Sequence, residues 1–280
     1  MGMIVVTGST GRLGGRVARR LAAAGIPQRL LVRDPARAPL LDGATVTTAE
    51  YSDATACRNA LTSGDTVLMV SAAEDADRLS QHRTFVDAAA EAGVGHLVYI
   101  SFYGAGPAST FTLARDHWAT EDHIKSTGLP HTFLRDNLYA DFIPMMVGPD
   151  DVLRGPAGTG RASVVAQDDI ADVATVVLRD PAPHTGLTHD LTGPAALTLT
   201  EMCQIITDVT GTPVRYHEET VTEAYESRSS HQAPSWLVDA WVSTYTAIAA
   251  GEMNGVGSAI PDITGHPATP LAEVIRRNRS

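Results

Sequence analysis

Short apolar runs alternate with amphipathic, helix-like stretches from the first residues of the chain to about residue 180. This alternation is typical of βαβ units, in which helices join parallel strands and cover the sheet. The predicted strands are Ile4–Thr7, Arg29–Val32, Thr45–Thr47, Thr66–Ser71, His96–Ser101 and Thr132–Leu134. The pattern therefore predicts an α/β protein with a doubly wound parallel sheet and helices on both of its faces.

Helix boundaries are marked by residues with clear conformational preferences. Gly25, Gly93 and Gly128 each follow an alanine-rich or polar helical stretch, as expected of the left-handed residue that ends a helix. A later helix is expected to begin at Asp168 and Asp169, whose carboxylates suit the positive end of the helix dipole.

Beyond residue 140 the pattern changes. Residues 148–160 are dense in Gly, Pro and Asp, which favours a long loop or a hairpin at the edge of the sheet. Thr198–Glu201 fits a capping box before a helix over Met202–Val209. Thr269–Pro270 begins a final helix that continues through Ile275.

A further helix is expected after Pro234, where Leu237, Trp241, Tyr245 and Ile248 recur at helical spacing. Its apolar stripe either packs in a core or forms one wall of a substrate site. The expected domains are a larger one over 1–140 and about 162–182, and a smaller carboxy-terminal α/β lobe over about 141–161 and 183–280.

Composition narrows the class of protein. At 44% hydrophobic content the chain can bury a full core, yet it has no run of about 18 apolar residues that could span a bilayer. The first residues lack the order of a secretory signal, so we expect a cytoplasmic protein with no membrane partner. The two cysteines, Cys57 and Cys203, predict no disulfide framework. A net charge of -11 disfavours nucleic acid as a partner.

A glycine-rich turn follows the first predicted strand and precedes an amphipathic stretch from Arg12 to Ala24. Gly8, Gly11 and Gly14 permit a tight turn, close approach of backbone N–H groups to a pyrophosphate, and close packing of helix on strand. The positive end of that helix would point at the phosphates. The predicted dinucleotide contacts are Gly8, Thr10, Gly11, Arg12, Leu13 and Gly14.

The choice of dinucleotide is predicted from the end of the second strand. An acidic residue there suits the 2′-hydroxyl of NAD, whereas arginine suits the 2′-phosphate of NADP through paired hydrogen bonds. The strand ends in Arg33, with Arg12 in the glycine-rich turn and Arg37 just downstream. We therefore expect NADPH rather than NADH, held by Arg33 and Arg12. Asp34 either repels the 2′-phosphate or points to solvent.

Residues at the ends of the later strands are expected to border the rest of the dinucleotide. Ser71 and Ala72 come at the end of the fourth strand and Ser101 at the end of the fifth, beside the nicotinamide half. Asp53, behind the third strand, either approaches the adenine or caps the next helix.

Six short segments occur in the order of motifs in a known family. They are Thr7–Gly14, Val32–Pro35, Gln81–Arg83, Leu113–His117, Leu134–Tyr139 and Gly265–Pro267. In these segments the chain resembles the NmrA-like atypical short-chain dehydrogenases, and most closely their bacterial NADPH-dependent quinone oxidoreductases and triphenylmethane reductases. The resemblance implies a Rossmann domain with a smaller carboxy-terminal lobe over the nicotinamide.

The resemblance also shows what is missing. Ordinary short-chain dehydrogenases protonate the carbonyl oxygen with the tyrosine of a Tyr-x-x-x-Lys motif. The one lysine here is Lys125, and the residue four positions before it is Glu121. In the isoflavone-reductase branch a lysine lies on the helix before Gly128, and His117 takes its place. A quinone or cationic dye is already electrophilic, so its reduction needs positioning more than proton donation.

His117 and Tyr103 are the candidate catalytic residues. His117 either binds the nicotinamide ribose or donates a proton, because histidine titrates near neutral pH. Alternatively, it is a partly buried helical residue that bonds Glu121 one turn away. The candidates for the acceptor pocket are Phe102, Tyr103, Asn137, Tyr139 and Phe142.

The sequence leaves the roles of two residues near this pocket open. It gives little support for a metal site or for a hydrolase. Arg135 either pairs with an acidic neighbour or contacts a ligand, and Asp136 stands where the resemblance leads us to expect asparagine. None of the ten histidines forms a His-Glu-x-x-His motif, so no metal site is expected. The sequence also lacks the Gly-x-Ser-x-Gly elbow of a hydrolase.

Three functions stay open at this point. The first is a reductase that moves hydride from NADPH to a quinone-like or other conjugated small molecule, which Tyr103 and Tyr139 favour. The second resembles the NmrA-type regulators, which bind a dinucleotide without turnover and signal redox state. The third is a biosynthetic reductase for one secondary metabolite. A monomer and a homodimer both fit the sequence.

Overall fold

The computed structural model describes residues 2–279, and the chain forms two compact units. The first unit comprises the residues up to 101, 116–135 and 170–189, and the second comprises 102–115, 136–169 and those from 190 onward. The expected division differs from this one at 102–115, 136–140 and 162–169, which belong to the second unit, and at 183–189, which belongs to the first. Segment 102–115 belongs to the second unit because Phe102 and Phe111 pack in the hydrophobic core of that unit.

A seven-stranded sheet, most of it in the first unit, has the order β3-β2-β1-β4-β5-β6-β9. Its strands are β1 (Ile4–Thr7), β2 (Gln28–Val32), β3 (Ala44–Thr48), β4 (Thr66–Met69), β5 (His96–Phe102), β6 (His131–Asp136) and β9 (Thr188–Leu191). Ile4 is in register with Gln28 of β2 and with Thr66 of β4, both in parallel. The strand order reverses between β1 and β4, so the predicted doubly wound fold is confirmed.

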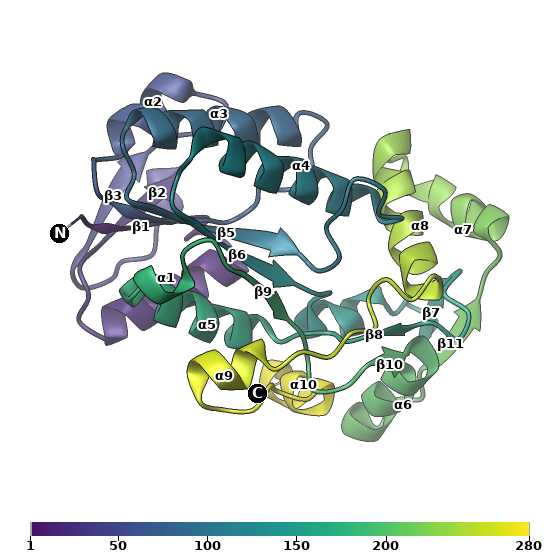
Figure 1. The fold of residues 1–280 in the computed structure, drawn as a ribbon. Coiled ribbons are helices and arrows are strands. Elements are labelled where there is room, and N and C mark those ends of the chain that lie inside the picture. Colours follow the sequence, from purple (N-terminus) through teal and green to yellow (C-terminus); the bar gives the residue numbers. More distant parts are fainter. Residues whose placement is uncertain (1, 280) are drawn as a thin grey trace. The chain divides into compact units, whose positions relative to one another are not determined.

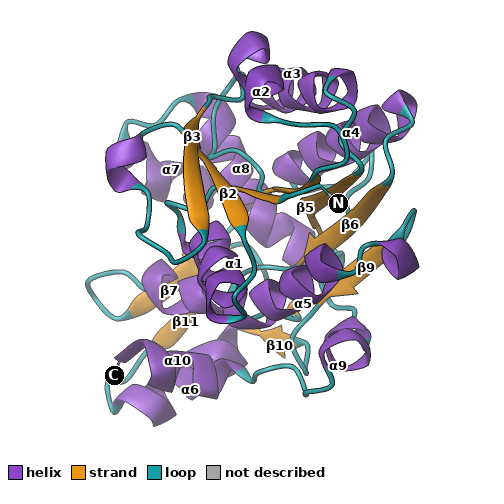
Figure 2. Cartoon of the chain, turned by 90° about the vertical axis from the view of Figure 1, so that its left-hand side faces the viewer, coloured by secondary structure: helices purple, strands orange, loops and turns teal. Residues whose placement is uncertain are grey.

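Helices cover both faces of this sheet, with α2, α3 and α4 on one face and α1 and α5 on the other (Figures 1 and 2). Their bounds are α1 (Arg12–Ala23), α2 (Ala54–Ala60), α3 (Arg78–Glu91), α4 (Thr112–Thr127) and α5 (Gln167–Arg179), with 3-10 helices at Pro35–Arg37 and Ala182–His184. Gly25, Gly93 and Gly128 follow α1, α3 and α4 with positive φ angles of 68°, 71° and 74°. The predicted helix ends are therefore confirmed.

The second unit contains two small sheets, and none of their strands is among those predicted from the sequence. The expected loop or edge hairpin over 148–160 is right only in part. Val147 and Leu153 form an antiparallel bridge around a turn at 148–151, but β7 (Val152–Gly155) pairs in parallel with β11 (Arg215–Glu218) in a separate sheet and not at the edge of the seven-stranded one. Glycine, proline and aspartate around β7 mask its short buried run. The other sheet pairs β8 (Arg161–Ala162) with β10 (Leu197–Thr198) in antiparallel.

The helices of the second unit surround its hydrophobic core. They are α6 (Leu199–Thr210), α7 (Val221–Arg228), α8 (Ser235–Ala249), α9 (Ala259–Thr264) and α10 (Leu271–Arg279), with 3-10 helices at Ala140–Met146 and Ser229–His231. The predicted capping box of α6 is present, since Thr198 and Glu201 exchange side-chain to backbone hydrogen bonds at 3.1 and 2.8 Å. Along α8, Tyr245 and Ile248 pack in the core, whereas Trp241 is half-buried.

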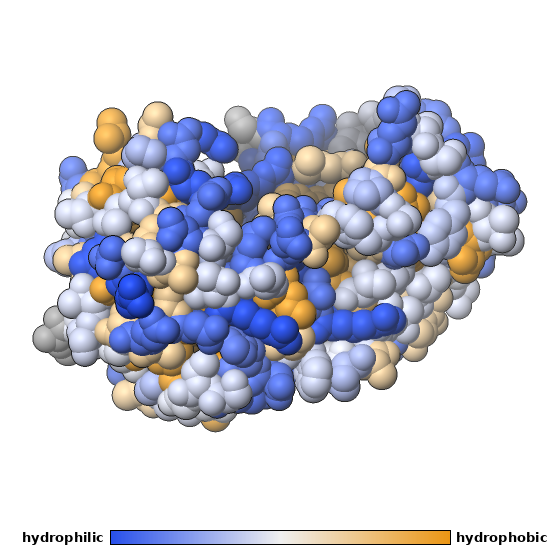
Figure 3. All heavy atoms as spheres, turned by 90° about the horizontal axis from the view of Figure 1, so that it is seen from above, coloured by the Kyte–Doolittle hydropathy of each residue, from blue (hydrophilic) through white to orange (hydrophobic). Residues whose placement is uncertain are grey.

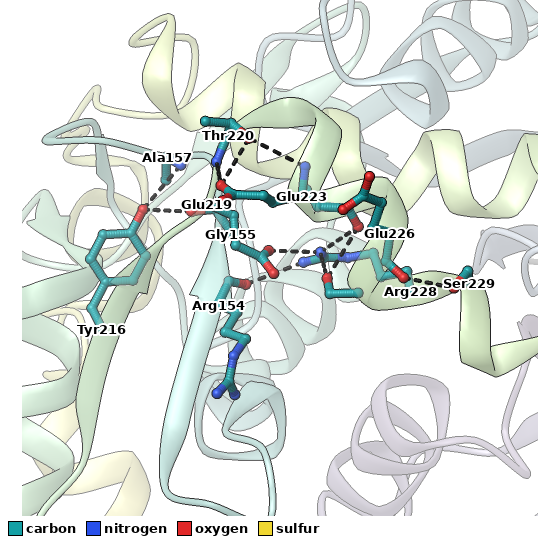
Figure 4. Close-up of polar contacts among 12 residues, drawn as sticks. Arg154, Gly155, Ala157, Tyr216, Glu219, Thr220, Glu223, Glu226, Arg228 and Ser229 are labelled. Carbon is teal, nitrogen blue, oxygen red and sulfur yellow. Dashed lines mark hydrogen bonds and ion pairs between the residues drawn. The ribbon is translucent and has the colours of Figure 1, made fainter.

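A buried ion pair joins α7 to the small parallel sheet of this unit (Figure 4). Nη1 of Arg228 donates to Oε2 of Glu219 at 2.9 Å, and Nη2 donates to the carbonyl oxygen of Arg154 at 3.2 Å. The guanidinium group also lies over the ring of Tyr245, 5.1 Å from its centroid. Removal of Arg228 would leave the buried carboxylate of Glu219 without this ion-pair partner, so the pair stabilises the position of α7.

Hydrophilic residues cover most of the face drawn in Figure 3, and apolar residues occur there in small groups. Such a mixture is ordinary for a surface that faces water. Within residues 2–279, no helix is both long and apolar enough to cross a membrane.

Candidate functional site

The glycine-rich turn between β1 and α1 has the geometry of an anion site. Gly8 adopts a φ of 63°, and the N–H of Gly11 donates to its carbonyl oxygen at 2.9 Å. A Cβ atom at Gly14 would lie only 2.4 Å from that same oxygen, so α1 packs on β1 more closely than any side chain allows. In its described part, α1 has neither a side-chain cap nor an acidic residue in the first turn. Its first N–H groups are therefore available to phosphate oxygens.

A buried atom in this turn gives a test of whether a polar ligand fits. Oγ of Ser9 is buried and has no hydrogen-bond partner among residues 2–279. A polar group buried without a partner is costly, so the site is built to receive one. The side chain of Leu13 is buried, whereas Thr10 and Arg12 are exposed beside it. Leu13 thus offers its backbone to a ligand, and its two neighbours also offer side chains.

Arginines follow β2 as the sequence predicts. Arg33 and Arg37 are exposed at the carboxyl end of β2, where a 2′-phosphate would be bound. Oδ1 of Asp34 accepts a hydrogen bond from the N–H of Ala36 at 2.9 Å and caps the short helix that follows. The carboxylate is therefore held by the chain itself. Asp53 behaves in the same way, because its Oδ1 accepts from the N–H of Ala56 at 2.9 Å and caps α2.

The loop after β4 approaches the glycine-rich turn. A Cβ atom at Gly8 would lie 3.0 Å from Cβ of Val70, and Ser71 and Ala72 follow directly. The N–H of Ala72 donates to Nε2 of His82 at 2.9 Å, and its carbonyl oxygen accepts from Nε of Arg78 at 3.0 Å. No role for Arg78 or His82 is predictable from the residue pattern alone. Only the Gln-His-Arg motif in the family resemblance drew attention to this helix.

His117 lies on α4 and is almost fully buried. Nη2 of Arg78 lies 2.9 Å from its Nε2, and Oη of Tyr99 lies 2.9 Å from its Nδ1. Arginine has only donors, so Nε2 accepts and Nδ1 carries the proton. Burial, followed by the charge of Arg78, lowers the pKa of His117 well below its ordinary value. The imidazole is therefore neutral near pH 7 and is no acid at that pH.

Glu121, the alternative partner expected for His117, forms an ion pair elsewhere. Its two carboxylate oxygens accept hydrogen bonds from Nε and Nη2 of Arg135 at 2.8 and 2.6 Å. The hydroxyl of Ser101 also donates to Oε1 of Glu121, at 2.6 Å. Arg135 thus pairs with an acidic neighbour, which was one of its two expected roles. Ser101 uses its proton within the protein and has only lone pairs to offer a ligand.

The second unit holds the residues expected to contact the acceptor. Phe102 is buried and its ring lies 4.9 Å from that of Phe111. Tyr103 is half-buried, and a Cβ atom at Gly255 would lie 1.9 Å from its Oη. The phenol therefore lies directly against the backbone of Gly255, where only glycine leaves room for it. The N–H of Tyr103 donates to the carbonyl oxygen of Asp136 at 2.8 Å.

The segment after β6 has one buried and two accessible candidates. The amide of Asn137 is fully buried and donates to Oγ of Ser163 and to the carbonyl oxygen of Met253, both at 2.9 Å. Its role in the fold is therefore structural. Tyr139 donates to Oδ2 of Asp136 at 2.9 Å, and its ring lies 5.3 Å from the 37%-exposed ring of Phe142. Of the five acceptor candidates, Tyr103, Tyr139 and Phe142 retain accessible surface.

Similarities to known proteins extend over both units. The profile of the NmrA-like family matches residues 1–232. Quinone oxidoreductase 2 of Escherichia coli (strain K12) is 31% identical over an alignment of 281 residues, which covers 98% of this chain and 97% of that protein. The NAD(P)H azoreductase of Xenophilus azovorans is 30% identical over an alignment of 276 residues, which covers 97% of this chain and 96% of the relative.

A solved structure is also similar to this chain over its full length. The crystal structure of the Escherichia coli NADPH-dependent quinone oxidoreductase QOR2, complexed with NADPH, matches with a TM-score of 0.90 at 30% identity. The match covers 99% of this chain and 100% of that one. The resemblance inferred from the six short motifs is therefore confirmed.

Proposed function

The chain belongs to the NmrA-like family, and from that premise we propose that it is an NADPH-dependent oxidoreductase acting on a quinone-like or other conjugated small molecule. The observation that carries the proposal is the anion site at the start of α1, where Gly14 packs against Gly8 and the helix lacks a side-chain cap. The two curated relatives named above, which match over nearly the full length, are a quinone oxidoreductase and an azoreductase.

Residues of the first unit would hold the dinucleotide. The N–H groups of the glycine-rich turn bind the pyrophosphate, and Arg33 and Arg12 bind the 2′-phosphate. Ser71, Ala72 and Ser101 border the nicotinamide half, and the neutral His117 offers no charge to it. NADPH, when bound there, supplies the hydride. Asp53 is left out of the set because it caps α2.

Residues of the second unit would hold the acceptor. Tyr103, Tyr139 and Phe142 provide aromatic surface for a flat conjugated ring. The acceptor gains the hydride, and the oxygen or nitrogen that becomes negative takes its proton from water. A site in which water supplies the proton suits an electrophilic acceptor, since the chain has no Tyr-x-x-x-Lys acid and His117 is neutral. We place this activity in the cytoplasm, in a monomer or homodimer. We expect no nucleic-acid partner, because the net charge is -11.

The Arg33→Ala variant is expected to lose about tenfold or more of its preference for NADPH over NADH. The exposed guanidinium at the end of β2 would otherwise form paired hydrogen bonds with the 2′-phosphate, which NADH lacks. The measurement is the ratio of kcat/KM for the two cofactors with one quinone. An unchanged ratio would mean that the 2′-phosphate is bound elsewhere. Arg58→Ala is a matched control, because Arg58 pairs with Glu91 on the surface.

The activity itself is tested with purified protein, NADPH or NADH, and a panel of quinones, azo dyes and triphenylmethane dyes. We expect acceptor-dependent loss of the reduced-nicotinamide absorbance, faster with NADPH. Tight dinucleotide binding without turnover across the panel would overturn the proposal for these acceptors. It would favour a redox sensor, or a reductase for one biosynthetic substrate.

A further inference from the structure

Ala72 is held by both of its peptide groups, and each is bound by a buried side chain of α3. Its N–H donates to His82 and its carbonyl oxygen accepts from Arg78, at 2.9 and 3.0 Å. His82 is fully buried and Arg78 is 4% exposed. We call this pair of side chains the Ala72 clamp. We propose that the Ala72 clamp positions the loop after β4 for the nicotinamide half of the dinucleotide, an inference that rests on the function proposed above.

The hydrogen bonds of His82 have a single consistent direction. Because the N–H of Ala72 can only donate, Nε2 of His82 accepts and its Nδ1 carries the proton. Nδ1 lies 3.0 Å from Oγ1 of Thr120, and that hydroxyl donates to the carbonyl oxygen of Asp116 at 2.8 Å. A chain of three hydrogen bonds therefore runs from the loop to the backbone of α4. Each of these hydrogen bonds therefore has one donor and one acceptor that can be assigned.

Arg78 forms a second connection between the same loop and the same helix. Its Nε donates to Ala72, and its Nη2 donates to Nε2 of His117 at 2.9 Å. Nη1 is buried, has no hydrogen-bond partner among the described residues, and lies 3.8 Å from Oδ2 of Asp116. A buried guanidinium with one nitrogen that makes no hydrogen bond is a costly way to fill space. The placement of its other donors therefore indicates positioning rather than packing.

The position of the loop after β4 indicates which half of the dinucleotide the Ala72 clamp would affect. Val70 contacts Gly8 of the glycine-rich turn, so the residues after it leave the sheet beside the pyrophosphate site. They follow β4, the first strand beyond the reversal of strand order, and the second half of the dinucleotide lies over these strands in doubly wound folds. Ala72 lies two residues beyond Val70. A displaced peptide there would disturb the nicotinamide half and leave the adenine half in place.

The experiment compares the whole cofactor with its adenine half. Binding of NADPH and of adenosine 2′,5′-bisphosphate is measured for the wild type, Arg78→Met and a matched control, Arg83→Met. Arg83 lies on the same helix and is exposed. We expect the Kd of Arg78→Met for NADPH to rise about tenfold or more, and its Kd for the bisphosphate to change less than about twofold. The control should bind both ligands as the wild type does.

Two outcomes would overturn the proposal. One is an unchanged affinity of Arg78→Met for NADPH, and the other is an equal loss of affinity for both ligands in an Arg78→Met protein that is folded. A wild-type protein that binds neither ligand would instead remove the proposed function, and the clamp with it. The two failures are therefore distinguishable.

A second pair of variants decides the matter if Arg78→Met does not fold. Glutamine at position 82 can still accept from the N–H of Ala72 through its side-chain oxygen, whereas leucine cannot. We expect His82→Leu to weaken NADPH binding about tenfold and His82→Gln to recover most of that loss, with the bisphosphate unaffected in both. Equal NADPH affinities for the two variants would show that the hydrogen bond to Ala72 does not position the loop.

Discussion

Replacement of Gly14 by alanine is expected to lower the affinity for NADPH about a hundredfold. The new Cβ atom would lie 2.4 Å from the carbonyl oxygen of Gly8 and 2.7 Å from that of Thr7. Both are backbone atoms, and neither can rotate away because Thr7 ends β1 and Gly8 forms the turn. Helix α1 would move off the strand and carry its N–H groups away from the phosphates. Titration of the protein with NADPH, followed by fluorescence, measures the loss.

Gly11→Ala is the graded control for this experiment. Its Cβ atom would lie 3.2 Å from the same oxygen of Gly8, a contact that small shifts can relieve. We therefore expect a loss of less than about tenfold. Thermal unfolding of both variants separates a local displacement of α1 from a general loss of structure. If Gly14→Ala bound NADPH as tightly as the wild type, close packing of α1 on β1 would not be what forms the site.

The parallel sheet is predictable from the sequence because its signals are local. All seven residues of β5 are buried, so the strand appears in the sequence as a continuous run of mostly apolar residues. β9 gives no such signal, because only Leu191 of its four residues is buried. β7 is hidden for a different reason, since its partner β11 lies about 60 residues further along the chain. Pairing of this kind depends on the folded chain and leaves no local pattern.

The candidate site also has a part with a local sequence signal and a part that depends on tertiary contacts. Three glycines at fixed spacing describe a turn that the backbone must make, so the anion site could be predicted. The protonation of His117 could not, because it depends on its burial and on Arg78, 39 residues earlier. The hydrogen bond by which Asp53 caps α2 likewise became evident only in the structure. Tertiary contacts decide such cases.

Glu121 stands at the position of the tyrosine in a Tyr-x-x-x-Lys motif, and its contacts limit what could replace it. Glu121, four residues before Lys125, is fully buried and paired with Arg135, while Ser101 donates to the same carboxylate. Side chains from β5, α4 and β6 are thereby tied together with their protons in fixed positions. A tyrosine acid could not be restored by one substitution here, since it would remove the buried carboxylate that Arg135 and Ser101 both bind. The arrangement therefore suits acceptors that need no acid from the protein.

The free energy of unfolding is expected to fall steeply as the pH drops from about 6.5 towards 4. Burial lowers the pKa of His82 to about 3 and that of His96 to about 4. Burial and the charge of Arg78 hold the pKa of His117 well below its ordinary value. All three imidazoles are neutral in the folded chain over most of this range, and His96 becomes protonated only as the pH approaches 4. In the unfolded chain they become protonated below about pH 6.5.

The sign of the effect follows from the proton count. The unfolded state binds more protons than the folded state in this window, so stability is complete above about pH 6.5 and is lost as the pH falls. Each histidine contributes up to about 1.4 kcal/mol per pH unit, and the three together approach about 4 kcal/mol per unit near pH 5. Because folded proteins are stable by only about 5–15 kcal/mol, a slope of this size would remove that stability over about one to four pH units. Urea titrations at half-unit steps of pH measure the slope.

His96→Gln tests whether these histidines cause the slope. Nε2 of His96 lies 2.8 Å from Oγ1 of Thr132, and glutamine can keep a hydrogen bond there without titrating. We expect the slope near pH 5 to fall by about a third, because one of three titrating groups is removed. A free energy of unfolding that stayed constant between about pH 7 and 5 would contradict the assignment of three buried, neutral imidazoles. It would also remove the reason for treating His117 as a group that cannot donate a proton.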